Sequence, residues 1–511
     1  MIDSTNTPSP NLRFILLVTA ILVGSFVRLV HPLSGTYPLN DGGLFYTMVQ
    51  DLSNSPVFLP HFTSYNHTQI PYAYPPLAFF LTNWIAALTR FPLMELIRLL
   101  PAIFSTLTIP AFYNLARRLL PTTNAALLST FGFALLPTAF DPLIVGAGLT
   151  RAPGLFFALL TLSELHALYT QPNRIRLART AIFAGLTLLS HPGMAWFTAY
   201  SSALLLIFHT SRGIVERIKL SFVAAVGTLA LTAPWWITII TRHGLNTLLS
   251  PFQTEAFSLT ALLTPFSLLF TNEALVAFLA VFGFLGFLSS LRVRRWLIPA
   301  WLLGVFIFEP RLGAAYAAVP AALLAGTGIE VALLNLDENQ PRAVRVHPAY
   351  QFALGFLLIY GVVAAYLAPN YARLSSEQVE AMQWARENTA AADAFIVLTG
   401  ARNYGTDYTS EWFPTLSERS SLATPQGHEW LPDGEFNRRA ELHATLQSCA
   451  GEDFACLETW VAGQGIRPTY LFISKKAFSE NGFDSRQMLS ALNAISTPIF
   501  ENSTTVIYPW P

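Results

Sequence analysis

Long apolar segments alternate with short polar ones from the N-terminus as far as residue 368. A helix of about 20 apolar residues crosses the hydrocarbon core of a bilayer. The segments cover residues 12–30, 73–91, 96–119, 124–140, 143–169, 178–190, 194–210, 218–240, 264–288, 296–309, 313–333 and 349–368. Because a backbone in lipid must satisfy its own hydrogen bonds, each segment is expected to be helical. The pattern predicts a mainly α, polytopic transmembrane helical bundle.

Basic side chains between alternate segments predict the topology, since cytoplasmic loops carry the Lys/Arg excess. The clusters are Arg117/Arg118, Arg174/Arg176/Arg179, Arg212/Arg217/Lys219, Arg292/Arg294/Arg295 and Arg342/Arg345. They share one side, with Arg13, only if residues 73–91 lie at the interface as a juxtamembrane helix. This parity predicts about 11 spans, a cytoplasmic N-terminus and an extracytoplasmic C-terminus. The alternative is that 73–91 spans and the clusters are divided between the two sides.

Residues 370–511 have a different character and predict a small extracytoplasmic α/β domain after a transmembrane domain of residues 1–369. Leu374–Asn388 and Asp484–Ile495 have helical patterns, whereas Ala394–Leu398, Thr469–Ser474 and a pair within Pro498–Tyr508 have strand patterns. Both cysteines of the chain, Cys449 and Cys456, lie here. Outside the cytoplasm they can form a disulfide, the alternative being two free thiols.

Composition narrows the class of function. Of 511 residues, 53% are hydrophobic and 12% charged, with a formal net charge of zero; soluble proteins carry about 25% charged residues. Zero net charge argues against a nucleic-acid partner. The sequence has no P-loop, GxGxxG motif, zinc-ligand spacing or Gly-x-Ser-x-Gly motif. Since no small-residue cleavage site follows residues 12–30, this segment is interpreted as an anchor rather than a signal peptide.

An aspartate opens the first outer loop, residues 31–95, within Asn40-Asp41-Gly42-Gly43. A carboxylate at the membrane surface can act as a general base or hold a divalent cation. The two glycines allow close backbone approach to a substrate. The alternative is that Asn40 or Asp41 caps the following helix.

Two further charges follow on the predicted outer face. Asp141 stands before Pro142 and could pair with Asp41 or cap the next helix. Arg151, at the start of an apolar helix, is costly there unless it is paired. It could hold a phosphate bidentately or form a structural ion pair with Asp141.

The same face carries other candidates for substrate contact. His191 lies where two apolar runs meet, and it could contact a phosphate or a metal, or be a satisfied helix-end histidine. Arg311 could bind phosphate, with Glu309 as its partner. His67 lies in the first outer loop.

Several short motifs resemble those of the C-type membrane glycosyltransferases, which include the protein mannosyltransferases, the aminoarabinose transferase of lipid A and the oligosaccharyltransferase catalytic subunit. Asn40–Gly43 stands where that superfamily has its acidic motif. The stretch from Tyr74 to Leu77 resembles the start of its juxtamembrane helix, and the stretch from Arg98 to Pro101 resembles its second span. Asp141 and Gly146–Arg151 stand near its second outer loop, and Trp384–Thr389 and Trp412–Glu429 resemble segments of its outer domain.

The resemblance implies transfer of a sugar, with inversion, from a polyprenyl-phosphate donor to a lipid, glycan or protein acceptor at the extracytoplasmic face of a plasma (inner) membrane. It assigns Asp41 as the catalytic base and implies substrate or lipid-phosphate contacts for Arg151, His191, Arg311, Tyr74 and His67. Asp41 and Asp141 would hold a divalent cation, Mg or Mn. The superfamily often has two adjacent acids here, whereas Asp41 is followed by glycine and Asp141 stands alone.

Two other functions compete with this interpretation. A transporter places charges near the bilayer midplane, often within two repeated halves; here the charges are at one surface and no repeat is visible. A non-catalytic membrane protein could use its outer domain to bind a partner. The distinguishing observation is whether Asp41, Asp141, Arg151 and His191 line one outward cavity.

Overall fold

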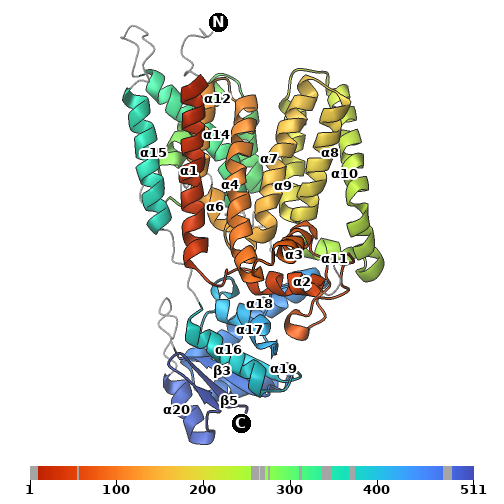
Figure 1. Cartoon of the computed structure of the whole chain (residues 1–511), viewed down its shortest axis with the longest axis vertical. Helices are drawn as coiled ribbons and strands as arrows, with labels where there is room; N and C mark the ends of the chain where they lie inside the picture. The colour runs from red at the N-terminus through yellow and green to blue at the C-terminus, as the bar shows by residue number, and fades with distance from the viewer. Residues whose placement is uncertain are drawn as a thin grey trace.

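The computed structural model describes residues 10–53, 57–254, 264, 271–273, 277–309, 313–335, 348–367, 374–475 and 486–511. Figure 1 shows a bundle of long helices with the C-terminal α/β region (residues 374–511) beneath one end. The bundle helices are α1 (Pro10–Ser34), α4 (Leu93–Leu119), α5 (Thr123–Leu135), α6 (Pro137–Phe140), α7 (Gly148–Thr170), α8 (Arg174–Ser190), α9 (Pro192–Phe208), α10 (Ile214–His243), α12 (Phe278–Arg292), α13 (Leu297–Phe308), α14 (Gly313–Asn335) and α15 (Pro348–Leu367).

The outer faces of the bundle are apolar, as lipid contact requires. Phe14, Leu22 and Phe26 of α1, and Phe222 and Leu229 of α10, are all more than half exposed. By length and composition, five helices of the described part can cross a membrane, or six if α5 and the bent segment after it form one broken span. The chain therefore has the character of a membrane protein, and the number of about 11 spans remains a prediction.

The C-terminal ends of α4 and α7 lie at the end of the bundle opposite the C-terminal α/β region (Figure 1), and arginines lie at and after these helix ends. At the C-terminal end of α7, Arg212 donates to the Tyr169 carbonyl and Arg176 to the Ala167 carbonyl, each at 2.9 Å. The guanidinium of Arg118, in α4, lies 3.6 Å from the carboxylate of Glu164, in α7. This gathering agrees with the charge parity predicted from the sequence, although Arg342 and Arg345 lie outside the described residues.

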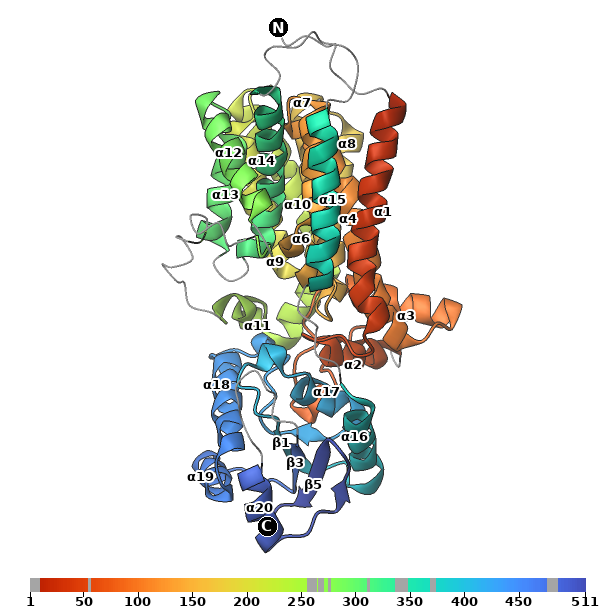
Figure 2. The same cartoon turned by 90° about the vertical axis from the view of Figure 1, so that its left-hand side faces the viewer.

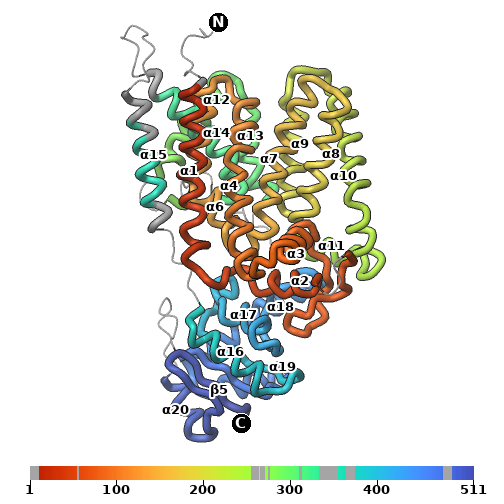
Figure 3. The backbone as a smooth tube through the Cα atoms, viewed as in Figure 1, coloured from red at the N-terminus to blue at the C-terminus, as the bar shows by residue number. Residues whose placement is uncertain are grey.

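Short elements cover the end of the bundle that faces the C-terminal α/β region. They are α2 (Gly42–Ser53), η2 (Tyr65–His67), α3 (Leu77–Thr89), η3 (Asp141–Leu143), α11 (Leu245–Leu249) and η4 (Ser250–Gln253). Figure 2 shows α3 extending sideways beside the lower end of α1 rather than running along it, as parity predicts for residues 73–91. In Figure 3 the backbone descends through α1, passes through α2 and α3, and returns through α4.

A five-stranded sheet organises the C-terminal α/β region. Its order is β2 (Ser420–Ser421), β1 (Ala394–Leu398), β3 (Tyr470–Ser474), β5 (Thr505–Pro509) and β4 (Phe500–Glu501). The β1 strand pairs in parallel with β2 and β3, whereas β5 pairs antiparallel with β3 and β4. The strand and helix segments predicted from the sequence are present. The predicted boundary between residues 369 and 370 lies outside the described residues.

Helices cover both faces of the sheet because side chains alternate along each strand. Ile396 and Leu398 pack with α18 (Glu435–Ser448), α19 (Phe454–Gln464) and α20 (Arg486–Ile495). Phe395 and Val397 pack with α16 (Ser376–Asn388) and α17 (Tyr408–Ser417) on the other face. Tyr37 also packs against this second cluster. The face that carries α17 therefore meets the first outer loop.

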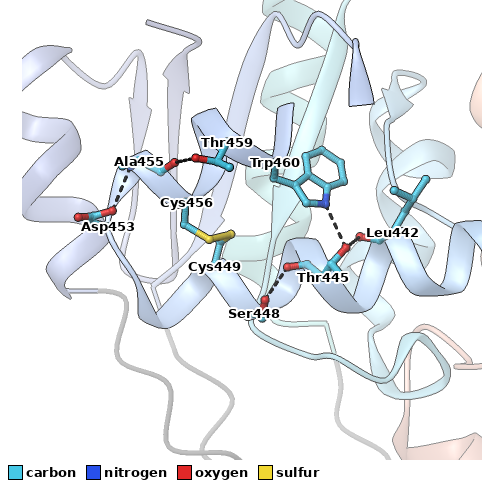
Figure 4. Close-up of a disulfide and its surroundings, with 9 residues drawn as sticks. All are labelled: Leu442, Thr445, Ser448, Cys449, Asp453, Ala455, Cys456, Thr459 and Trp460. Carbon is cyan, nitrogen blue, oxygen red and sulfur yellow. Dashed lines mark hydrogen bonds between the residues drawn. A yellow bond between two sulfur atoms is a disulfide. The ribbon is translucent and has the colours of Figure 1, made fainter. Parts of the chain in front are cut away.

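A disulfide joins Cys449 and Cys456, the first of the two alternatives left by the sequence. Figure 4 shows it between the end of α18 and the start of α19. Asp453 caps α19 through the Ala455 N–H at 3.1 Å, and the Trp460 indole donates to Thr445 at 3.1 Å. The disulfide and these hydrogen bonds fix the two helices against one face of the sheet.

Candidate functional site

Asp41 occupies a tight turn that leads directly into α2. Asn40 and Asp41 both have left-handed backbone conformations, with φ of 66° and 68°, which aspartate and asparagine tolerate better than most residues. The Asp41 carbonyl accepts the first helical hydrogen bond, from the Phe45 N–H at 2.8 Å. Asp41 is thus the backbone cap of α2, as one sequence interpretation proposed, and the side chain of this capping residue is partly exposed.

Helix α17 of the C-terminal α/β region lies against this turn (Figure 1). The Glu411 carboxylate, which is fully buried, accepts from the Asn40 N–H at 2.9 Å and from the Gly43 N–H at 3.3 Å. A Cβ at Gly43 would lie 2.8 Å from the Glu411 carbonyl oxygen. The glycine therefore permits close approach by α17, whereas the sequence suggested approach by a substrate.

Burial and the neighbouring Asp41 carboxylate raise the pKa of Glu411 to about 8, against the opposing effect of the backbone N–H groups of Gly43, Asn40 and Gly42. A carboxyl group that receives several N–H donors in a dry environment is held rigidly by them. Glu411 therefore links the C-terminal α/β region to the turn that carries Asp41.

The segment between η3 and α7 contacts the same turn from the bundle side. The Gly146 N–H donates to the Leu39 carbonyl at 2.7 Å and the Ala147 N–H to the Asn40 carbonyl at 2.5 Å. A Cβ at Gly146 would lie 2.5 Å from the Gly42 backbone, so this position requires glycine. Since α7 begins at residue 148, the contact fixes the first turn of α7, which carries Arg151, beside the Asp41 turn.

Tyr74 lies at the centre of the charged groups. Its hydroxyl donates to Glu429 Oε1 at 2.7 Å, and its ring packs on Trp430 with centroids 4.8 Å apart. Burial, Glu429 and Asp41 raise the pKa of Tyr74 well above its ordinary value, while Arg151 opposes them. One buried hydroxyl thus lies within electrostatic reach of two carboxylates and a guanidinium, supplied by the first loop, α7 and the C-terminal α/β region.

A mostly apolar cavity opens beside Arg151, lined also by Thr138, Met194 and Tyr316. The Arg151 Nε atom is buried without a hydrogen-bond partner. None of the ion pairs among the described residues includes its guanidinium. The structural ion pair with Asp141 that the sequence allowed is therefore not formed. A cation facing an apolar cavity is suited to an anionic group attached to an apolar chain.

His191 lies near this cavity and caps α9. Its Nδ1 accepts from the Met194 N–H at 3.3 Å, which leaves the proton of the neutral ring on Nε2. A Cβ at Gly154, one turn after Arg151, would lie 3.3 Å from the His191 Cβ. The structure thus brings His191 to the same side of α7 as Arg151, while its ring serves as the cap that the sequence left as an alternative.

Asp141 interacts with Arg28, a buried arginine of α1. Arg28 donates to Ser105 at 3.0 Å and to the Phe133 carbonyl at 3.4 Å. The helix breaks after α5 with a bend of 76°, which frees carbonyl groups that Arg28 satisfies. Asp141 therefore lies within electrostatic reach of Arg28 at this break.

The remaining predicted residues have different locations. His67 is exposed, and its Nε2 lies 3.4 Å from the Glu418 carbonyl, at the end of α17 beyond Glu411. Arg311 lies outside the described residues. The structure thus groups Asp41, Tyr74 and Arg151, with His191 beside the cavity, and places His67 in the contact between the first loop and α17.

No protein-family model matches the chain, and no curated protein sequence matches it. Solved structures do. The oligosaccharyltransferase of Archaeoglobus fulgidus matches 98% of this chain and 74% of its own at 15% identity, with a TM-score of 0.63. ArnT from Cupriavidus metallidurans, bound to undecaprenyl phosphate, matches 98% of each chain at 13% identity, with a TM-score of 0.59. The mycobacterial arabinofuranosyltransferase AftD matches 99% of this chain and 40% of its own at 15% identity, with a TM-score of 0.60.

The chain has the GT-C fold. The resemblance of its short motifs to the C-type membrane glycosyltransferases is thereby confirmed at the level of the fold.

Four residues around the site of this GT-C fold were not among the predicted site residues. Glu411 and Glu429 come from the C-terminal α/β region, and Arg28 from the first apolar segment. Trp235 donates to the Ala73 carbonyl at 3.3 Å, directly before Tyr74. The sequence signal for Arg28 was a charge inside an apolar span. The two glutamates have no local signal, because their partners lie more than 300 residues away.

Metal binding by this GT-C fold remains a prediction. Within the described ranges there is no group of three His, Cys, Asp or Glu side chains placed to hold a metal ion. Asp141, the predicted partner of Asp41 in such a site, interacts with Arg28. The reaction proposed for this site uses side chains alone.

The buried His428, next to Glu429, predicts a pH dependence of stability. Burial and Arg439 lower the pKa of His428 to about 4 from 6.5, so the unfolded chain takes up a proton first as the pH falls. The contribution of neutral His428 to the free energy of unfolding is fully present above about pH 6.5. It falls by about 3 kcal/mol as the pH drops toward 4. The thermal midpoint of the C-terminal α/β region, followed by tryptophan fluorescence, should fall accordingly. His428→Gln should reduce this fall, and His67→Gln, at an exposed site, should not.

Proposed function

We propose that this chain is a membrane glycosyltransferase that moves a sugar from a polyprenyl-phosphate donor to an acceptor hydroxyl. The single observation that carries the proposal is that backbone hydrogen bonds join the Asp41 turn to the start of α7, which carries Arg151, with both charges within electrostatic reach of Tyr74. The GT-C fold supports it, and so does the undecaprenyl phosphate bound to the structurally similar ArnT.

The reaction we infer is a direct displacement at the anomeric carbon. The Asp41 carboxylate accepts the proton of the acceptor hydroxyl as its oxygen forms a bond to that carbon. The bond from the anomeric carbon to the phosphate oxygen breaks, and the polyprenyl phosphate leaves with the electron pair. Arg151 stabilises the negative charge that grows on the departing phosphate. One displacement without a covalent intermediate inverts the anomeric centre.

The position of the site relative to the bilayer fits this reaction. Apolar side chains line the small cavity beside Arg151, and in this proposal the isoprenoid chain of the donor stays in the bilayer while its phosphate meets the guanidinium. The basic side chains at the opposite end of the bundle favour a cytoplasmic location for that end. We therefore assign the site, and the C-terminal α/β region, to the extracytoplasmic face of a prokaryotic plasma (inner) membrane, with a lipid, glycan or protein as acceptor.

The donor class is tested with purified protein in liposomes and a panel of radiolabelled polyprenyl-phosphate sugars, with bacterial membranes as the source of acceptor. Label should move from at least one of these donors only in liposomes that contain the protein, and nucleotide sugars should give no transfer. Transfer from nucleotide sugars alone would contradict the proposal.

A further inference from the structure

The turn that carries Asp41 is held from two sides, by the backbone N–H groups of Gly146 and Ala147 from the bundle and by side chains of α17. Besides Glu411, the Trp412 indole donates to the Pro38 carbonyl at 3.0 Å and Thr415 donates to the Gly43 carbonyl at 2.8 Å. Three side chains of one helix, α17, thus bind the backbone just before and after Asp41. No helix of the bundle provides a comparable set of side-chain contacts among the described residues.

Glu411 is the ionisable member of this set, and its side chain is fully buried. Its two carboxylate oxygens accept from different ends of the turn, one from Asn40 and one from Gly43. The residue is buried, and its own carbonyl accepts from the Tyr65 hydroxyl at 2.7 Å. A carboxylate can bridge two N–H donors in this way, whereas a glutamine amide offers one acceptor oxygen and points N–H groups at the other donor.

The bridge matters because the turn is conformationally strained. Two successive non-glycine residues, Asn40 and Asp41, have left-handed conformations, and each such conformation persists only where the surroundings impose it. Without Glu411 the buried N–H groups on both sides of Asp41 lose their acceptor. The turn then keeps fewer of its contacts, and the Asp41 carboxylate can shift.

We propose that Glu411 is the positioning residue through which the C-terminal α/β region holds Asp41 in the geometry for catalysis. The inference rests on the proposed function, in which Asp41 is the base. Glu411 itself does not touch the substrate; it fixes the backbone on either side of the residue that does. It follows that the C-terminal α/β region is part of the catalytic apparatus.

The test compares Glu411→Gln, Glu411→Asp and the matched control Glu418→Gln in the full-length protein. Glu418 follows the C-terminal end of the same helix, and its side chain is 54% exposed and pairs with Arg386 on the surface. Two quantities are measured for each variant: amide hydrogen exchange in residues 38–47, and kcat and KM with the donor used by the wild type.

In Glu411→Gln, exchange in residues 38–47 should rise by about tenfold, because buried N–H groups lose their acceptor. The kcat should fall by about 100-fold while KM for the donor changes by less than about threefold, since misplacing a catalytic group by about 1 Å has an effect of this size. Glu411→Asp should recover part of both, and Glu418→Gln should match the wild type.

Should Glu411→Gln fail to fold, Thr415→Val removes one hydrogen bond of the same set and should raise exchange by about threefold. Wild-type exchange in the folded variants would overturn the inference, and so would raised exchange with unchanged kcat. Absence of transfer by the wild type from every donor contradicts the proposed function alone, because the exchange measurement needs no substrate.

Discussion

Asp41→Asn is expected to lower kcat by about 1000-fold, the middle of the range for loss of a general base. The substitution removes the group that accepts the proton but keeps the shape of the side chain. Asparagine also tolerates the left-handed conformation at this position, where φ is 68°. The fold and donor binding should therefore be retained, and only the chemical step should be lost. Initial rates of sugar transfer over a range of donor concentrations measure the effect.

Asp433→Asn is a matched control for this variant. Asp433 is also left-handed, with φ of 65°, also precedes a glycine, and is exposed at the start of α18. The Asp433→Asn variant should transfer sugar at the wild-type rate. Equal activity of the Asp41 and Asp433 variants would remove Asp41 from the reaction.

Arg151→Gln is expected to weaken binding of undecaprenyl phosphate by about 100-fold, as removing one member of a desolvated charge pair does. The guanidinium lies at an apolar cavity with its Nε atom unpartnered, so a lipid phosphate gains its main counter-charge there. Arg151→Lys keeps the charge but loses the planar fork, and should weaken binding by about tenfold. Titration of the purified variants with undecaprenyl phosphate in detergent, followed by native mass spectrometry, measures these affinities.

Arg90→Gln provides the comparison for Arg151. Arg90 is an exposed arginine at the end of α3, so its loss should leave the affinity unchanged. Similar losses in the two variants would mean that the lipid responds to general surface charge and not to the cavity.

Much of the membrane-embedded architecture could be predicted from one sequence. Apolar runs located the helices, and the positions of Arg118, Arg176 and Arg212 grouped their ends correctly, because both signals are local. The break after α5 was not predicted. There Arg28 satisfies carbonyl groups more than 100 residues away, and no periodicity within a segment encodes such a pairing.

The candidate site was predicted in part for the same reason. Asp41, Tyr74 and Arg151 stand in short motifs near helix starts, so the resemblance to C-type glycosyltransferases selected them. No local pattern distinguishes Glu411 and Glu429 from other glutamates. Their role in the site comes from contacts between regions that are distant in the sequence. Gly43 illustrates the difference: its sequence context suggested space for a substrate, but the neighbour that requires a glycine is helix α17.

The central claim is that the Asp41 carboxylate drives sugar transfer from a lipid phosphate. A single-turnover experiment tests it most directly, with radiolabelled polyprenyl-phosphate sugar bound in equal amounts to the wild type and to Asp41→Asn before acceptor is added. The wild type should release polyprenyl phosphate and form labelled product, while Asp41→Asn should hold the donor intact. Conversion of the bound donor by Asp41→Asn at the wild-type rate would contradict the claim.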